Sequence, residues 1–97
     1  MDVNRALRKA IDTGKVLIGA RETQRALKTN KVKMVILAAN CRTNYREEFE
    51  KYQNVPKYWY KGTNMELGSA CGKPFPISTI AVMDSGESNI MELLEEQ

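Results

Sequence analysis

Segments with the apolar spacing of helices alternate along this chain with short segments that are apolar throughout, and this alternation most constrains the fold. The clearest strand is predicted at residues 34–39, an unbroken apolar run that is typical of a strand covered on both faces. Further strands are predicted at residues 16–18, 58–60 and 77–83. Because helical segments precede, separate and follow these strands, the predicted order is αβαβαβαβα, and we expect a three-layer α/β/α sandwich.

The helical segments carry recognisable start and stop signals. Asp2 can cap the first helix, Gly14 can end it, and the second helix is predicted at residues 21–30. The expected caps of the later helices are Thr43 or Asn44 for the third, Thr63 or Asn64 for the fourth, and residues 84–88 for the last. Their predicted inward positions are, in turn, Tyr45, Phe49 and Tyr52; Met65, Leu67 and Ala70; and Ile90, Met91, Leu93 and Leu94.

A chain of 97 residues is expected to form one domain, residues 1–97, because single domains commonly have about 100–150 residues. No apolar run approaches the ~20 residues that span a bilayer. The first residues also lack the long apolar segment of a signal peptide, so we expect an intracellular protein.

Charge is distributed unevenly along the chain. Residues 1–33 contain nine Lys or Arg against three Asp or Glu, whereas residues 84–97 contain five acids and no base. This asymmetry favours a basic face for an anionic partner, with the acidic end held away from it. A solvated surface of uneven composition would give the same counts, so charge alone leaves both interpretations open.

Several catalytic and metal chemistries are excluded by composition. Histidine is absent, which removes His-dependent nucleophilic catalysis and every His-ligated metal site. Cys41 and Cys71 match neither a paired zinc motif nor a disulfide framework, so we expect two buried thiols. The glycine-rich stretch at residues 61–68 fits no phosphate loop, and Gly68 is expected to allow close helix packing. We therefore expect a protein that is not an enzyme and needs no metal or cofactor.

The turn between the first strand and the second helix is the first candidate binding segment. Gly19 permits a sharp turn or the close approach of a ligand, and the N–H groups of the helical turn that begins near Ala20 favour phosphate. Arg21 can bind phosphate or a guanine edge, and Glu22 can accept hydrogen bonds from a base or stabilise the helix end. An ordinary strand-to-helix turn is the alternative.

Two further loops carry candidate binding residues. Asn40 and Arg42 follow the second strand; if the first two strands are a parallel pair, both end at the sheet edge where α/β proteins usually bind ligands. The Asn40 amide can donate to and accept from a base edge, and Arg42 can reach phosphate. In the third loop, Phe75 lies between two prolines and near Lys73, which suits stacking on an unpaired base. The alternatives are a loop of capping residues and a Phe75 that fills the core.

Five segments in register carry a resemblance to a known family. They are Gly-Ala-Arg-Glu-Thr at 19–23, Ile-Leu-Ala-Ala-Asn at 36–40, Gly-Thr-Asn-Met-Glu-Leu-Gly at 62–68, Gly-Lys-Pro-Phe at 72–75 and Asp-Ser-Gly-Glu-Ser at 84–88. Together they resemble the ribosomal protein thirty family of the archaeal and eukaryotic large subunit, within the superfamily of kink-turn RNA binders. The resemblance covers essentially the whole chain, and the short N-terminus is similar to that of archaeal members.

The resemblance implies a four-stranded mixed sheet between helices that binds a kink-turn in ribosomal RNA. It also implies a cytoplasmic ribosomal protein with neighbouring ribosomal proteins as partners and a monomer when free. The family's contact positions match Gly19, Arg21, Glu22, Asn40, Arg42, Lys73 and Phe75. Here Phe75 is expected to stack on an extruded nucleotide, and the residues expected to position phosphates are Lys15, Lys28, Arg42 and Lys73. The wider superfamily usually has Asn where Arg21 stands.

Geometry adds one condition to this reading. The first two candidate loops follow strands, whereas the loop with Phe75 precedes one. All three loops can share an edge only if the fourth strand runs antiparallel to the first two. Two other functions stay open: a kink-turn protein of another ribonucleoprotein, such as a small-RNA-guided modification particle, and a protein–protein adaptor that uses the acidic end and Trp59. A nucleotide-dependent transferase is disfavoured because a histidine and a phosphate loop are both missing.

Overall fold

Helices and strands alternate through the computed structural model, which describes residues 2–96. The elements are α1 (Val3–Thr13), β1 (Lys15–Ile18), α2 (Ala20–Leu27), β2 (Met34–Leu37), α3 (Thr43–Glu50), β3 (Lys57–Trp59), α4 (Asn64–Ala70), β4 (Thr79–Asp84) and the 3-10 helix η1 (Ile90–Glu95). The predicted alternation is confirmed except at its end, where the last helix is 3-10 rather than α. Its bonds run over three residues, from the Glu92 N–H to the Asn89 carbonyl and from the Glu96 N–H to the Leu93 carbonyl, as is common in short terminal helices.

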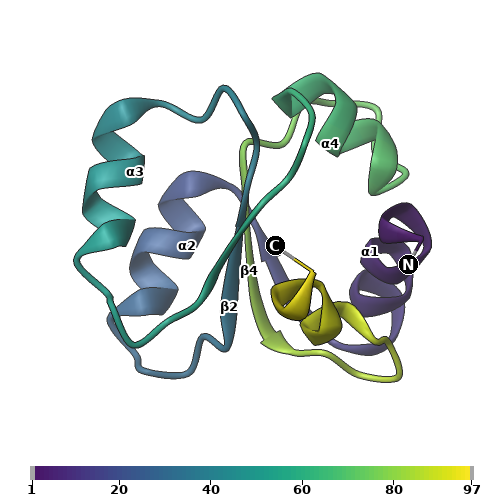
Figure 1. Cartoon of the computed structure of the whole chain (residues 1–97), viewed down its shortest axis with the longest axis horizontal. Coiled ribbons are helices and arrows are strands. Elements are labelled where there is room, and N and C mark those ends of the chain that lie inside the picture. Colours follow the sequence, from purple (N-terminus) through teal and green to yellow (C-terminus); the bar gives the residue numbers. More distant parts are fainter. Residues whose placement is uncertain (1, 97) are drawn as a thin grey trace.

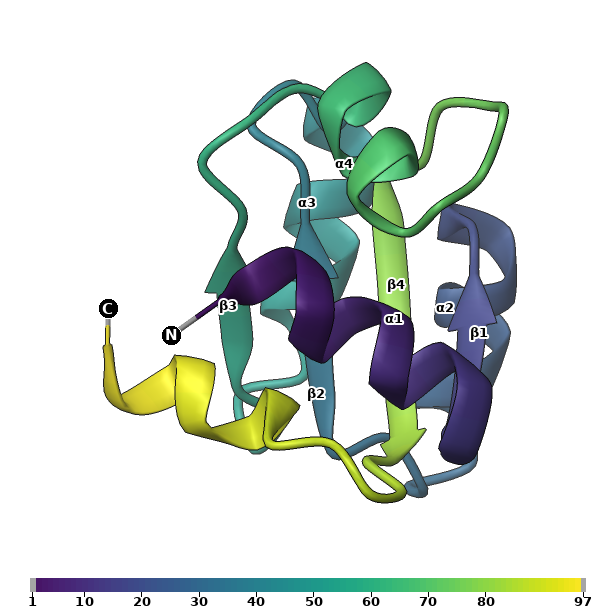
Figure 2. The ribbon, with the colours of Figure 1, turned by 90° about the vertical axis from the view of Figure 1, so that its right-hand side faces the viewer.

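The four strands form one mixed sheet in the order β1-β4-β2-β3. Strand β4 is antiparallel to both β1 and β2, whereas β2 and β3 are parallel. Strands β1 and β2 are not a hydrogen-bonded pair, because β4 lies between them. They nevertheless run in the same direction, so both end at the edge of the sheet where β4 begins (Figure 2).

Helices cover both faces of the sheet, which confirms the three-layer sandwich (Figure 1). One core lies under α1, α4 and η1, and its largest fully buried side chains are Leu7, Met34, Ile36, Leu67, Ile77, Ile80, Ile90 and Leu93. The other lies under α2 and α3, and it includes Leu27, Val35, Leu37 and Phe49. Strand β2 supplies side chains to both cores, which is why its sequence is apolar at every position.

The helix starts agree with the sequence at α1 and α4 and differ at α3. The Asp2 carboxylate caps α1 by accepting from the Arg5 N–H, and Thr63 caps α4 in a capping box with Glu66. The predicted cap of α3 at Thr43 or Asn44 is wrong. Both residues are already helical, since the preceding Arg42 has the extended backbone of an N-cap and its side chain makes no capping bond.

Met65 was predicted to face the core, and this prediction is wrong. Its side chain is 66% exposed, whereas Leu67, Gly68 and Ala70 of the same helix are buried. Residues two positions apart in an α-helix are about 200° apart around its axis, so a helix that turns Leu67 inward turns Met65 outward.

Among residues 2–96, no helix is long and apolar enough to cross a membrane.

Candidate nucleic-acid interface

Three polar loops meet at the edge where β1 and β2 end and β4 begins (Figure 2). Backbone hydrogen bonds fix this meeting. The Gly19 N–H donates to the Thr79 carbonyl at 2.9 Å, and the Ala38 N–H donates to the Ser78 carbonyl at 2.9 Å. Strand β4 runs antiparallel to β1 and β2, so the condition under which all three loops can share one edge is met. We call this edge, with residues 19–22, 40–42 and 72–76, the loop face.

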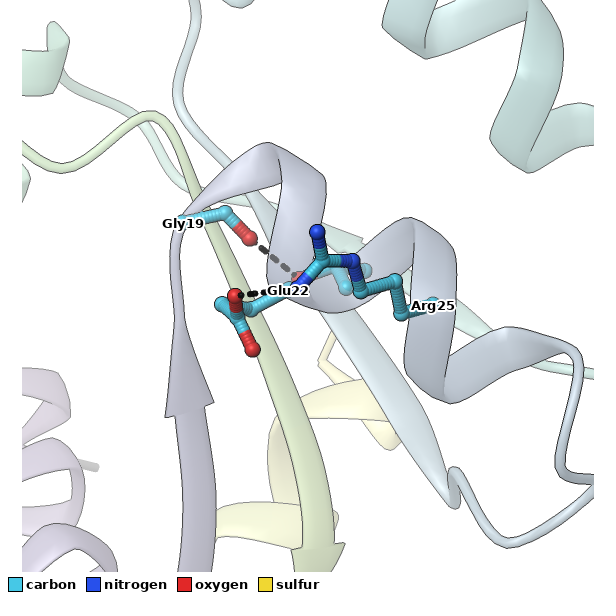
Figure 3. Close-up of polar contacts among 4 residues, drawn as sticks. Gly19, Glu22 and Arg25 are labelled. Atoms are coloured by element: carbon cyan, nitrogen blue, oxygen red, sulfur yellow. Dashed lines mark hydrogen bonds and ion pairs between the residues drawn. The ribbon is translucent and has the colours of Figure 1, made fainter.

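The first loop turns at Gly19, whose backbone has φ 114° and ψ 151°. Residues other than glycine rarely adopt this backbone conformation, although a Cβ added at Gly19 would have no atom within 4 Å. The backbone of Gly19 is therefore open to a ligand. No side chain caps the N-terminus of α2, so no side chain there accepts from the first N–H groups of the helix. These groups and the positive end of the helix dipole point toward the side on which the Gly19 backbone is open. The Gly19 carbonyl accepts from the Thr23 N–H at 3.0 Å and from the buried Thr23 hydroxyl at 2.8 Å, which holds the turn in place (Figure 3).

The charged groups that follow this turn lie on the surface of α2. Glu22 is exposed and its carboxylate lies 3.5 Å from the guanidinium of Arg25 (Figure 3). Both side chains are solvated, so this ion pair contributes little to stability and can open when a ligand binds. An open groove of about 370 Å³ runs along the same side of the helix and is lined by Arg21, Gln24, Arg25, Lys28 and Tyr45.

Three basic residues line this groove and could contact one ligand together. Arg21, Arg25 and Lys28 stand at i, i+4 and i+7, and that spacing puts them on one stripe of the helix. Lys28 is thus separated from the loop face but joined to Arg21 through the groove. Arg25 was not among the predicted site residues, although the same spacing in the sequence could have identified it.

In the second loop, the Asn40 side chain is bound to the start of α4. Its Oδ1 accepts from the Asn64 N–H at 2.8 Å, and its Nδ2 donates to Asn64 Oδ1 at 3.0 Å. The amide that was expected to read a base edge is therefore engaged largely within the protein. Arg42 is exposed at the N-terminus of α3, a second helix on this edge without a side-chain cap. Asn64 was missed, since nothing local in the sequence pairs residues 40 and 64.

The third loop presents Phe75 to solvent. Its side chain is 49% exposed, so it does not fill the core; the buried side chain at this end is Ile77. The loop is held against α4 by its backbone: the Lys73 N–H donates to the Gly68 carbonyl at 3.0 Å, and the Ile77 N–H donates to the Asn64 carbonyl at 2.9 Å. Gly68 does permit close packing, but against this loop rather than a helix, because an added Cβ would stand 2.0 Å from the Phe75 carbonyl oxygen.

Positive charge gathers where α4 ends and the Phe75 loop begins. Arg8 reaches across from α1, and its Nε donates to the Ala70 carbonyl at 3.2 Å. Burial raises the pKa of the Cys71 thiol to about 11, while the charges of Lys73 and Arg8 act in the opposite direction. Cys41 and Cys71 are buried free thiols, as predicted, and Cys41 Sγ lies 3.5 Å from the Thr79 hydroxyl under the loop face.

Lys15 lies apart from the other predicted site residues. It begins β1 opposite Asp84, at the end of the strand away from Gly19. The loop face therefore brings together Gly19, Ala20, Arg21, Glu22, Asn40, Arg42, Lys73 and Phe75, with Lys28 along the adjoining groove. Within the described part of the chain, no group of three or more His, Cys, Asp or Glu side chains could hold a metal ion.

A mixed four-stranded sheet between two helical layers, with basic loops at one edge, defines a small α/β protein of the three-layer class. The model of the ribosomal protein L7Ae/L30e/S12e/Gadd45 family matches residues 1–92. The chain belongs to this family, as the five sequence segments indicated.

Several archaeal relatives share the name large ribosomal subunit protein eL30. The large ribosomal subunit protein eL30 of Methanocaldococcus jannaschii is 46% identical, over 100% of this chain and 91% of that protein. Those of Methanoregula boonei and Sulfolobus acidocaldarius are 44% and 42% identical, over 96% and 93% of this chain and 96% and 89% of theirs. These are names of ribosomal proteins rather than of enzymes, in agreement with the prediction that the chain is not an enzyme.

Proposed function

We propose that this protein is a structural, RNA-binding component of the large ribosomal subunit. The family and the names of the archaeal relatives support this assignment. Its partners are ribosomal RNA and neighbouring ribosomal proteins, and its place in the cell is the cytoplasmic ribosome. Residues 1–97 act as one RNA-binding domain, which is a monomer when free.

The loop face recognises a kink-turn, an RNA element whose backbone bends sharply and exposes unpaired bases. The observation that carries this proposal is the convergence of the exposed Phe75 ring with two uncapped helix starts on one edge of the sheet. An extruded base can stack on the ring, while the helix starts accept phosphates of the folded backbone. A straight duplex offers neither an extruded base nor two phosphate strands so close together.

Each side chain of the face takes a role that its position allows. Arg21 and Glu22 contact exposed purine edges, and Arg42 and Lys73 contact phosphates on either side of the bend. Lys28 extends the phosphate contact along the groove beside α2. Lys15, at the far end of β1, meets phosphates only where the RNA continues past the loop face.

A small-RNA-guided particle would use the same face, because it also offers kink-turns. The archaeal relatives favour the ribosome, since each carries the name of a large-subunit protein. The adaptor alternative has less support: the Arg46 guanidinium lies 4.9 Å from the centroid of the Trp59 ring, so a neighbouring side chain already covers one face of the ring that an adaptor would use.

A gel shift against a kink-turn RNA and a straight duplex of equal length tests the proposal. The kink-turn should bind more tightly at every salt concentration. If about five phosphates are contacted, the logarithm of the binding constant should fall with the logarithm of salt concentration at a slope near −4. Equal affinities for the two RNAs would rule out recognition of the bend. Tighter binding to guide-RNA kink-turns than to those of large-subunit RNA would favour the other particle.

A further inference from the structure

We propose that Asn64, in the first turn of α4, is a positioning residue for RNA binding that acts through Asn40; the inference rests on the proposed RNA-binding function. Two hydrogen bonds join these residues, from the Asn64 N–H to Asn40 Oδ1 at 2.8 Å and from Asn40 Nδ2 to Asn64 Oδ1 at 3.0 Å. A backbone N–H can only donate, so the Asn40 atom that faces it is the oxygen. The orientation of the Asn40 amide is thereby fixed.

Asn64 also holds the loop that carries Phe75. Its carbonyl accepts from the Ile77 N–H at 2.9 Å, and Ile77 is a buried residue two positions after Phe75. One asparagine thus connects the second loop of the face to the third. The connection is supported nearby by the Ala39 N–H, which donates to the Gly62 carbonyl at 2.8 Å.

This pairing limits what Asn40 can recognise. An asparagine binds adenine through the amide edge that presents its oxygen and one N–H side by side, toward N7 and N6 of the base. In this protein Asn64 already occupies that edge. The second Nδ2 hydrogen points away from Asn64, and it lies too far from the free lone pair of Oδ1 to form such a pair with a base. Asn40 therefore donates one hydrogen bond to an acceptor atom of the RNA, such as a phosphate oxygen or a purine N7.

Replacement of Asn64 separates positioning from folding. Asn64→Ala removes the side-chain acceptor and leaves the backbone N–H. The affinity for the kink-turn should fall about two- to tenfold, the range expected for one neutral hydrogen bond. Thr63→Ala is the matched control, because it removes the N-cap of the same helix and leaves both bonds of Asn64 in place. It should lower the melting temperature and change the affinity less than about twofold, a smaller effect than loss of a hydrogen bond to the ligand.

A double-mutant cycle tests whether Asn64 acts through Asn40. In the Asn40→Ala protein, Asn64→Ala should cause no further loss of affinity. Losses that simply add would mean that Asn64 works independently, and an Asn64→Ala protein that binds as tightly as the unaltered one would also overturn the inference. If the unaltered protein does not prefer the kink-turn to the duplex, the proposed function itself fails, which is a different result.

Modified RNA tests the restriction on Asn40. Each adenosine of the kink-turn is replaced in turn by purine riboside, which lacks the N6 amine. The loss of affinity caused by Asn40→Ala should be the same on every one of these RNAs. An RNA on which Asn40→Ala weakens binding clearly less would reveal a two-bond contact to that adenine, because purine riboside keeps N7 and loses only the bond from N6; the claim of a single donated bond would then be wrong.

Discussion

Phe75→Ala separates the two roles that a loop phenylalanine can have. About half of the side chain is already exposed to solvent, since its exposed fraction is 49%. Full burial of a Phe side chain stabilises a fold by about 1.5–3 kcal/mol, so its truncation here should cost the fold only about 1 kcal/mol. The loop backbone should keep its place, because the Lys73 and Ile77 N–H groups anchor it to α4 without the ring.

The same substitution should weaken RNA binding much more. Stacking of a base on an aromatic ring contributes about 1–3 kcal/mol, which corresponds to an increase of about 5- to 150-fold in Kd. The assay is a gel shift or a fluorescence anisotropy titration with a kink-turn RNA, together with urea unfolding monitored by circular dichroism. The loss should be largely independent of salt concentration, because stacking releases no counterions.

Phe75→Leu is the matched control for stacking. Leucine retains much of the apolar contact with the loop but has no aromatic face, so the stability should stay near that of the unaltered protein while the affinity falls. Phe75→Tyr should restore most of the affinity. The reasoning would be refuted if Phe75→Leu bound the kink-turn as tightly as the unaltered protein, or if Phe75→Ala abolished folding.

Three further predictions test other parts of the molecule. Gly68→Ala would bring a Cβ to 2.0 Å from the Phe75 carbonyl oxygen, so the loop must move; stability should fall by about 1–3 kcal/mol in urea unfolding, and kink-turn affinity should fall with it. Gly19→Ala should cost about 1–3 kcal/mol through its backbone angles alone, because they lie in a region nearly restricted to glycine while the space beside it is open; a larger loss would indicate a steric clash. Burial raises the pKa of the Cys71 thiol from 9 in the unfolded chain to about 11 in the folded protein. The stability that this thiol contributes is therefore complete below pH 9 and is lost as pH rises toward 11. Urea unfolding midpoints across this range should fall more steeply for the unaltered protein than for Cys71→Ala, and parallel curves would contradict this.

The layers of this fold could be predicted from the sequence because each depends on local patterns. The run at residues 34–39 indicates a strand buried on both faces, and β2 does supply side chains to two cores. Local features left two positions open for Phe75: the flanking prolines and nearby lysine suit an exposed ring, whereas an isolated phenylalanine can also fill the core beneath its loop. What the sequence left open was the position of β4, because the pairing of β4 with two earlier strands depends on contacts distant in the chain.

The candidate site was predictable as a set of loops but not as a set of contacts. Residue types identified Asn40 and Arg42, since amides and guanidinium groups suit RNA. The engagement of Asn40 by Asn64 could not be predicted, because it joins residues 24 positions apart and needs α4 to begin beside the end of β2. Lys15 shows the opposite limit: its charge suited a phosphate contact, yet it stands at the start of β1, at the end of the strand away from the loop face.

The way the loops are joined bears on how such a face can recognise shape. Each loop is tied to another part of the same edge by a backbone hydrogen bond: Gly19 to Thr79, Ala38 to Ser78, and Ile77 to Asn64. In the proposed complex, the backbone spacing of these loops is therefore set before RNA arrives, and the protein would lose little backbone conformational entropy on binding. A face of fixed spacing binds most tightly the RNA that already matches it. An RNA that must first be bent pays the cost of bending, so discrimination between a kink-turn and a duplex does not require many base-specific contacts.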